Sequence, residues 1–314
     1  MAGDIQIRQL EYLVALAREQ HFARAATACH ASQPALSTAI RKLEVQLGVT
    51  IVQRGQRFSG FTPEGQRVVG WAHRILAERD GLREDLSRMR QGLVATLRIG
   101  AIPTAVPVTA LLTTPFSDKH PLATVRIEVL SSREIVRKLA DFELDAGLTY
   151  LSPASPTGTR SVGLYQERYL LLTPSDGEFG ARDSVTWAEA ASQPMCALGT
   201  NMQNRRILDA AVAAAGGAQM DPVLETDTVD AIYAHVATRR WSAIIAHTWL
   251  HAFGLPAGTS AVPLTEPSPH PTVGLLISDH EPPPIAASAL LEAVTDTDVP
   301  TALNHSVQQA LARA

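Results

Sequence analysis

Cysteine is scarce in this 314-residue chain, and long apolar runs are missing from it. Its two cysteines, Cys29 and Cys196, lie far apart and neither belongs to a CxxC pair, which argues against a disulfide framework and a zinc ribbon. No stretch of roughly 18 apolar residues is free of charge, and the first residues lack the pattern of a signal peptide. We therefore expect a soluble, cytoplasmic protein with reduced thiols and no membrane partner.

Motifs of catalysis and metal binding are also missing. The sequence contains no phosphate-binding glycine loop and no Ser/His/Asp spacing of a hydrolase. His247 and His251 are spaced like two metal ligands on a helix, but the glutamate of a zinc peptidase motif is absent. We expect no catalytic residue, no metal site and no cofactor.

Charge is unevenly distributed along the chain. The net charge is -4, yet residues 1–92 hold 13 Lys and Arg against 9 Asp and Glu, a net charge of +4. The remaining residues hold 14 against 22, a net charge of -8. A basic front joined to an acidic remainder indicates two modules with different partners.

The N-terminal part has the pattern of a small helical domain. Apolar residues follow helical spacing in residues 7–17, 21–29 and 33–47, and Gly48 is placed to end the third helix. The pieces VTIVQR and RFSGFT are rich in β-branched and aromatic residues and meet around Gly55, which predicts a small hairpin. Three helices followed by a hairpin form the outline of a winged helix-turn-helix.

A long helix is predicted next, with Thr62 as its cap and Pro63 at its first position. Over residues 63–90 such a helix spans about 40 Å, more than one small domain covers. Its seam follows heptad spacing, interrupted by a charge; the seam residues are Val68, Ala72, Ile75, Arg79, Leu82, Leu86 and Met89. We expect a dimerisation helix, with a long surface helix as the alternative.

From Gly92 onward, short β-branched runs alternate with helical segments. This alternation indicates a parallel α/β sheet, and a second unit of the same kind begins at ERYLLLTP. The run PTVGLLIS is predicted to return to the first unit as a strand. Two such units leave a cleft at the carboxyl ends of their strands, where small ligands bind.

A long ordered motif runs through the front of the chain, with Phe22, Ala25 and Ala26, SQPALS from Ser32 to Ser37, Leu43-Glu44 and Leu47-Gly48, the wing residue Arg54, and Thr62 and Gly65. Through this motif the chain resembles the LysR-type bacterial transcriptional regulators over more than sixty residues. The pieces LRIGAIPT and LADFELDAGL are similar to the family's effector domain. Phe142 stands where the family has glycine, and Arg240-Trp241-Ser242 replaces its Gly-x-Gly turn.

This resemblance implies an α+β multidomain protein. Residues 1–61 would form a winged helix-turn-helix DNA-binding domain and residues 62–92 a linker and dimerisation helix. A C-terminal two-subdomain α/β effector domain resembling periplasmic binding proteins would follow. Residues 93–163 and 268–300 would form its subdomain 1, residues 164–267 its subdomain 2, and residues 301–314 a C-terminal tail.

The function implied is that of a transcriptional regulator and not of an enzyme. Its partners would be double-stranded promoter DNA, a small anion or polar metabolite as effector, and further copies of itself in a dimer or tetramer. A periplasmic-type solute-binding protein is an alternative, which residues 1–92 and the missing signal peptide argue against. An enzyme using the cleft is another, which lacks an activated nucleophile.

The polar front of the third helix supplies the expected DNA contacts. Small side chains permit close approach to the major groove, Gln33 suits an adenine edge, and the wing arginines suit phosphate or the minor groove. Ser32 serves equally well as a helix cap. The expected DNA-binding residues are Ser32, Gln33, Pro34, Ala35, Ser37, Thr38, Arg41, Arg54 and Arg57.

Three polar turns follow strands of the acidic part, and by resemblance they line the effector cleft. The expected effector-binding residues are Thr104, Ser131, Ser132, Thr200 and Asn201, and their hydroxyl and backbone N–H groups suit an anion. Ordinary N-capping is the alternative for each turn. Some family members sense peroxide through a cysteine in the third turn, but this turn carries Met202 and no cysteine, so we expect no redox sensing.

Overall fold

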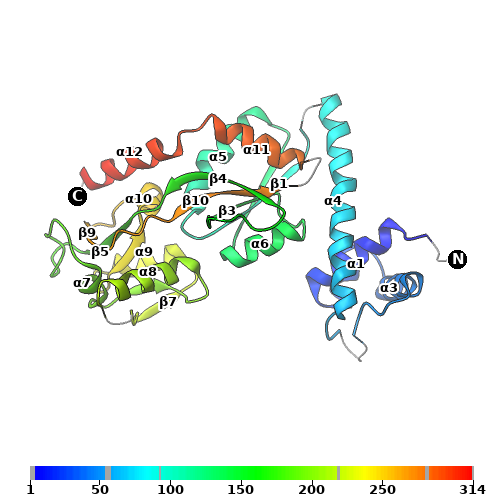
Figure 1. Cartoon of the computed structure of the whole chain (residues 1–314), viewed down its shortest axis with the longest axis horizontal. Coiled ribbons are helices and arrows are strands. Elements are labelled where there is room, and N and C mark those ends of the chain that lie inside the picture. The colour runs from blue at the N-terminus through cyan, green and yellow to red at the C-terminus, as the bar shows by residue number, and fades with distance from the viewer. Residues whose placement is uncertain (1–3, 54–57, 92, 218–219, 280–282, 313–314) are drawn as a thin grey trace. The chain divides into compact units, whose positions relative to one another are not determined.

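The computed structural model describes residues 4–53, 58–91, 93–217, 220–279 and 283–312. The chain forms two compact units (Figure 1). The first holds Met1–Gly92 together with Asp141–Glu143, and the second holds Leu93–Ala140 and Leu144–Ala314. Among the described residues, no helix has both the length and the apolarity that crossing a bilayer requires.

The first unit begins with three short helices around a small core. They are α1 (Ile7–Glu19), α2 (Phe22–Ala28) and α3 (Gln33–Leu47). Leu16, Leu36 and Ile40 are buried where the three helices meet. Ser32 caps α3, because its Oγ accepts the Ala35 N–H at 3.3 Å, and Gly48 ends the helix with a left-handed φ of 68°.

The wing after α3 is described only in part. In its described part it consists of one antiparallel bridge, Val52 to Phe61, while residues 54–57, with Arg54 and Arg57, lie outside the described residues. The Ile51 carbonyl faces Gly65, where an added Cβ would lie 2.1 Å from that oxygen. Only glycine therefore lets the next helix start against the wing.

Helix α4 (Pro63–Gln91) carries the predicted heptad seam, but part of the seam is already occupied within this unit. Ala72 is fully buried in a core shared with Leu13 of α1, and Arg79 donates to Glu11 of the same helix. Other apolar residues of α4 are exposed, namely Trp71, Ile75, Leu82 and Leu86. The side chain of Met89 lies outside the described residues.

The second unit contains two subdomains, and subdomain 1 is built on a five-stranded sheet of order β2-β1-β3-β10-β4. Its strands are β1 (Thr96–Ala101), β2 (Thr124–Val129), β3 (Ala146–Tyr150), β4 (Thr159–Gln166) and β10 (Thr272–Ser278). The prediction of a parallel sheet is correct for β1, β2 and β3 and wrong for the rest, because β10 runs antiparallel to both β3 and β4. Strand β4 continues three residues past the expected boundary at 163.

Helices cover both faces of this sheet. Figure 1 shows α5 (Val106–Lys119) and α11 (Ile285–Thr295) on one side and α6 (Ser132–Ala140) on the other. The expected tail is instead part of α12 (Val299–Ala312), which packs against α10 (His247–Phe253). Leu303 and Val307 of α12 are buried, so this segment belongs to the core.

Subdomain 2 has a three-stranded antiparallel sheet of order β8-β5-β9 and a parallel pair, β6 with β7. Its elements are β5 (Tyr169–Pro174), α7 (Trp187–Ala191), β6 (Cys196–Leu198), α8 (Gln203–Ala214), β7 (Leu224–Thr226), α9 (Val229–Val236), β8 (Ala243–Ala246), α10 and β9 (Thr259–Pro263). The chain passes between the subdomains twice, through Glu167-Arg168 after β4 and through residues 264–271 before β10. We call Glu167-Arg168 the hinge connection.

Both departures from the family pattern lie at or beside left-handed backbone. Phe142 has a φ of 57°, and Arg239, next to the replaced glycine turn, has a φ of 59°. Glycine adopts this conformation without steric cost, which gives a physical reason for the glycine usual at the first site. The turns keep their shape here with bulkier residues in a less favourable conformation.

Candidate functional site

The exposed face of α3 follows from the way its apolar residues are buried. Leu36, Ile40 and Leu43 point into the core. The polar residues between them are therefore left at the surface; Gln33, Pro34, Ala35, Thr38 and Arg41 are exposed, and Ser37 is half-buried. This surface contains every expected contact residue of the helix.

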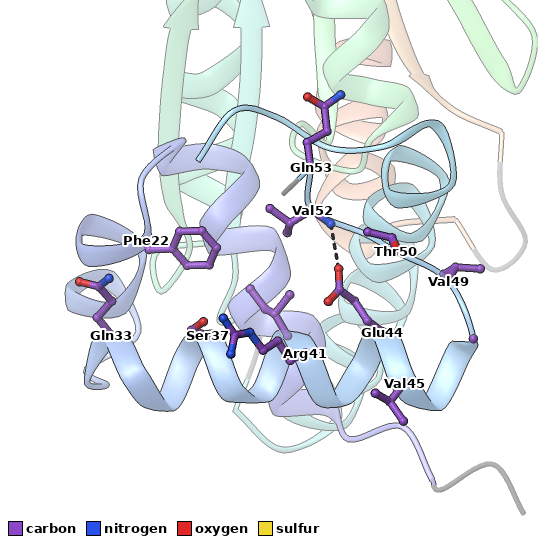
Figure 2. Close-up of a pocket in the computed structure, with 12 residues that line it drawn as sticks. Phe22, Gln33, Ser37, Arg41, Glu44, Val45, Val49, Thr50, Val52 and Gln53 are labelled. Atoms are coloured by element: carbon purple, nitrogen blue, oxygen red, sulfur yellow. Dashed lines mark hydrogen bonds between the residues drawn. The ribbon is translucent and has the colours of Figure 1, made fainter. Parts of the chain in front are cut away.

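A groove of about 860 Å³ runs between α3 and residues 48–53, and we call it the α3 groove. Figure 2 shows Gln33, Ser37 and Arg41 following one another along one side of α3, with Phe22 and Val52 across from them. Pro34, Ala35 and Thr38 lie outside the groove on the neighbouring exposed surface. Thr50 and Gln53 also line the groove, although sequence reasoning did not select them.

Glu44 holds the wing to α3 and so shapes the groove. Its Oε1 accepts the backbone N–H of Ile51 at 2.7 Å and of Val52 at 3.0 Å, the second of which is drawn in Figure 2. These charge-assisted bonds fix residues 51 and 52 against α3.

A cleft with a volume of about 320 Å³ lies between the two subdomains, where the sequence predicts the effector cleft. Helix α6 and strands β3 and β4 of subdomain 1 form one wall, and the first turns of α8 in subdomain 2 contribute the other. Its polar lining includes Ser132, Arg133, Thr149, Ser161, Gln203 and Arg206. Two helices thus begin at the cleft, where their free N–H groups favour an anion.

The five expected effector-binding residues have different surroundings in the structure, and only one of them lines the cleft. Ser132 lines the cleft. Ser131 is a cap, because its Oγ accepts the Glu134 N–H at 3.3 Å. Its own N–H and Oγ donate to Glu134 Oε2 at 2.9 and 2.6 Å, and these bonds lower the pKa of Glu134. Thr104 is buried behind the cleft, and Thr200 and Asn201 are exposed outside the cleft lining.

Two arginines and two orphaned hydroxyls give the cleft its chemical character. Arg133 on α6 and Arg206 on α8 have no ion-pair partner among the described residues. The buried Oγ of Ser132 and Oγ1 of Thr149 have no hydrogen-bond partner there either. Sequence reasoning missed both arginines, although their places in the first turns of helices after polar loops were readable.

Behind the cleft, Glu167 is fully buried in the hinge connection. Its Oε1 accepts the hydroxyls of Tyr150 and Tyr169, each at 2.7 Å. Burial raises the pKa of Glu167, while these hydrogen bonds oppose the rise. Sequence reasoning did not select Glu167. An acidic residue between two mostly apolar strands is the sequence feature that could have identified it.

The thiols and the histidine pair show no reactive arrangement. Burial raises the pKa of Cys29 and of Cys196, and neither residue lies in the turn over 199–204. The buried His247 Nδ1 accepts the Arg168 N–H at 3.1 Å, and burial lowers the pKa of His247 to about 4. Within the described ranges, no group of three His, Cys, Asp or Glu side chains is placed to hold a metal.

Two family profiles match nearly the whole chain. Residues 7–66 match the bacterial regulatory helix-turn-helix proteins of the lysR family, and residues 90–298 match the LysR substrate binding domain. The DNA-binding transcriptional dual regulator OxyR of Escherichia coli K12 is 30% identical over 298 residues, covering 92% of this chain and 95% of that protein. The hydrogen peroxide-inducible genes activator of Haemophilus influenzae is 27% identical over 299 residues, covering 93% and 97%.

Solved structures share the fold over the full length. A variant of full-length OxyR from Pseudomonas aeruginosa has a TM-score of 0.75 at 27% identity, covering 95% of this chain and 97% of that chain. Full-length CbnR in complex with its target DNA has a TM-score of 0.64 at 22% identity, covering 93% and 99%. The chain therefore belongs to the LysR family and is a DNA-binding transcriptional regulator with an effector-binding domain, not an enzyme.

Proposed function

We propose that this regulator binds double-stranded promoter DNA through α3 and the wing, and that a small anion in the cleft between its subdomains controls that binding. The observation that carries the proposal is a pair of arginines, Arg133 and Arg206, which different subdomains contribute to one cleft and which have no ion-pair partner in the described part of the chain. Such a protein works in the cytoplasm, where promoter DNA is found.

On the DNA side, the exposed front of α3 supports the assignment of roles. The Gln33 amide can bond the N6 and N7 of an adenine, and Arg41, two turns further along, can reach a base or the backbone. Ala35, Ser37 and Thr38 are small enough to leave room for the groove edge. Ser32 and Pro34 form the first turn, whose free N–H groups suit a phosphate, and Arg54 and Arg57 of the wing add phosphate or minor-groove contacts.

On the effector side, the cleft suits an organic molecule with two acidic groups. Arg133 would hold one group beside the Ser132 and Thr149 hydroxyls, and Arg206 would hold the other from α8. Because the arginines belong to different subdomains, a dianion stabilises one relative orientation of the two. That orientation then sets the spacing of the α3 helices on DNA.

Self-association would place two α3 helices on one operator. The exposed Trp71, Ile75, Leu82 and Leu86 of α4 form an apolar surface of the kind that pairs with a second copy. A dimer formed this way binds two half-sites, and two dimers form a tetramer.

Peroxide sensing through a cysteine of the 199–204 turn is not part of the proposal. The similar activator of Haemophilus influenzae is named for hydrogen peroxide-inducible genes, but this chain has no cysteine in that turn, and its two thiols have raised pKa values. A thiolate is the reactive form, so a raised pKa disfavours reaction.

A screen of carboxylates against the full chain tests the effector assignment. Thermal unfolding is followed with mono- and dicarboxylates of matched length, and footprinting is done on the DNA upstream of the gene. We expect a dicarboxylate to raise the Tm more than its monocarboxylate partner and to change the footprint. Equal Tm shifts from both classes, or a footprint that no anion changes, would contradict the proposal.

A further inference from the structure

Tyr150 lies between the cleft and the hinge connection. Tyr150 is one of the residues that line the cleft, and its hydroxyl donates to Glu167 Oε1 at 2.7 Å. The same hydroxyl accepts from Asn204 Nδ2 at 3.3 Å and lies 3.2 Å from Thr104 Oγ1. Thr104 belongs to subdomain 1, Asn204 to α8 of subdomain 2 and Glu167 to the hinge connection. One hydroxyl therefore joins all three parts of the effector domain, and we call these four residues the Tyr150 hub.

The partner of this hub on the cleft side is α8. Gln203 and Arg206 of α8 line the cleft, and Asn204 sits between them with its side chain buried against Tyr150. A ligand that moves the first turn of α8 or the Tyr150 ring must therefore also move the contact between Asn204 and the Tyr150 hydroxyl.

The surroundings of Glu167 hold the Tyr150 hydroxyl in place. Tyr150, Tyr165 and Tyr169 face it from β3, β4 and β5, and its Oε2 has no hydrogen-bond partner among the described residues. The His247 ring of α10 packs against the Tyr165 ring, with the two ring centroids 5.7 Å apart. The Arg168 guanidinium donates to Asn304. A carboxyl buried without a cation loses much when a donor leaves, so half-open arrangements are disfavoured.

We propose that Tyr150 and Glu167 are positioning residues that transmit effector occupancy from the cleft to the hinge connection. The inference rests on the proposed function of the cleft. With the hub intact, the subdomains hold the orientation of this structure. With the bond to Asn204 broken, α8 is released from the Tyr150 hub, and the domain takes a second orientation.

The chain offers a closely matched pair of variants to test this. Tyr150→Phe keeps the ring in the cleft wall and removes the hub hydroxyl. Tyr165→Phe removes the same atom from a neighbouring buried tyrosine whose hydroxyl has no partner among the described residues. The second test variant is Asn204→Ala, which removes only the hydrogen bond between α8 and the Tyr150 hydroxyl. The conservative variant is Glu167→Gln, which keeps an acceptor for the hydroxyls of Tyr150 and Tyr169.

The first measurement is coupling, defined as the ratio of operator Kd without and with saturating succinate, the small dicarboxylate probe. We expect the coupling ratio of Tyr150→Phe and Asn204→Ala to fall close to 1, measured at succinate concentrations that saturate each variant. Tyr165→Phe and Glu167→Gln should keep the parent ratio. A parent-like ratio in Tyr150→Phe and Asn204→Ala, or an equal loss in Tyr165→Phe, would overturn the inference.

A second measurement needs no ligand and separates this inference from the proposed function. Spin labels are placed by Glu292→Cys in subdomain 1 and Asp230→Cys in subdomain 2, both at exposed positions, in a chain without its two native cysteines. We expect the label-to-label distances to broaden or shift in Tyr150→Phe and Asn204→Ala and to match the parent in Tyr165→Phe. If succinate fails to bind the parent, the proposed effector class is wrong, yet these distances still decide on the hub. Identical distances in all variants would refute it.

Discussion

Neighbouring serines of one turn have different roles in this protein. Ser131 and Ser132 are adjacent, yet Ser131 is hydrogen-bonded to Glu134, while the buried Oγ of Ser132 at the cleft has no hydrogen-bond partner among the residues that the structure describes. A hydroxyl already bonded within its own helix contributes little to a ligand, whereas an orphaned one gains a bond when the ligand arrives. The orphaned hydroxyl is therefore the better predictor of a binding role.

Ser32 is expected to contribute to stability through its cap. We predict that Ser32→Ala lowers the free energy of unfolding of the N-terminal domain by about 1 kcal/mol, because the Ala35 N–H loses its acceptor. Urea unfolding monitored on this domain measures it. Ser37→Ala, a half-buried serine one turn into the same helix, is the control and should be nearly neutral. Equal losses in both variants would argue against the cap.

The contribution of Glu167 to the free energy of unfolding is expected to fall as the pH rises. Burial raises the pKa of its carboxyl, so above the ordinary value of about 4.3 the folded state binds more protons than the unfolded state. The folded state is therefore favoured at low pH, and this advantage is lost as the pH rises through the raised pKa. Glu167→Gln should lack this loss, so its stability relative to the parent should increase with pH.

Urea titrations from pH 4 upward measure this difference at each pH. Glu134→Gln is the opposite-sign control, because the pKa of Glu134 is lowered and its contribution is lost as the pH falls. If the difference in free energy of unfolding between Glu167→Gln and the parent stays constant with pH, the pKa of the Glu167 carboxyl is not raised by burial.

At the scale of elements, α3 was predictable almost residue by residue. Its Leu and Ile spacing, its Ser-x-Pro start and its final glycine agree with the helix Gln33–Leu47 and its caps. Local spacing determines which face is buried, so the exposed polar face follows from it. The long helix and most strands were predictable for the same reason.

The assembly of those elements was less predictable. Alternation of strands and helices does not give the direction of a strand that returns from a distant part of the chain, so the antiparallel β10 was missed. The cleft combines α6 with α8, about seventy residues later, and nothing local signals that Arg133 and Arg206 share it. The Ser131 cap, by contrast, was readable as Ser-x-x-Glu.

The exposed face of α3 and the wing are predicted to differ in role, the first contacting base edges and the second contacting phosphates. Gln33→Ala should weaken binding to the operator by about 1–3 kcal/mol and leave binding to a scrambled duplex nearly unchanged, because it removes a contact to a base edge. Arg54→Ala should weaken binding to both duplexes and reduce the salt slope by about 1. Electrophoretic titrations at several salt concentrations measure both, and parent-like binding by both variants would refute these roles.

At the scale of the whole molecule, the chain combines a basic front with an acidic remainder, +4 against -8. The first favours approach to DNA, and the second limits binding of DNA to the effector domain. The regulatory link proposed between them depends on an anion held by two arginines of the cleft, and this is the central claim.

Operator titrations with the double variant Arg133→Ala/Arg206→Ala test this claim most directly. Parent, double variant and Arg137→Ala, an exposed arginine of α6 outside the cleft lining, are titrated against the upstream DNA with and without dicarboxylates. We predict that a dicarboxylate changes the operator Kd of the parent and of Arg137→Ala by about fivefold or more, while the double variant binds DNA without responding. A double variant that responds like the parent would contradict the account.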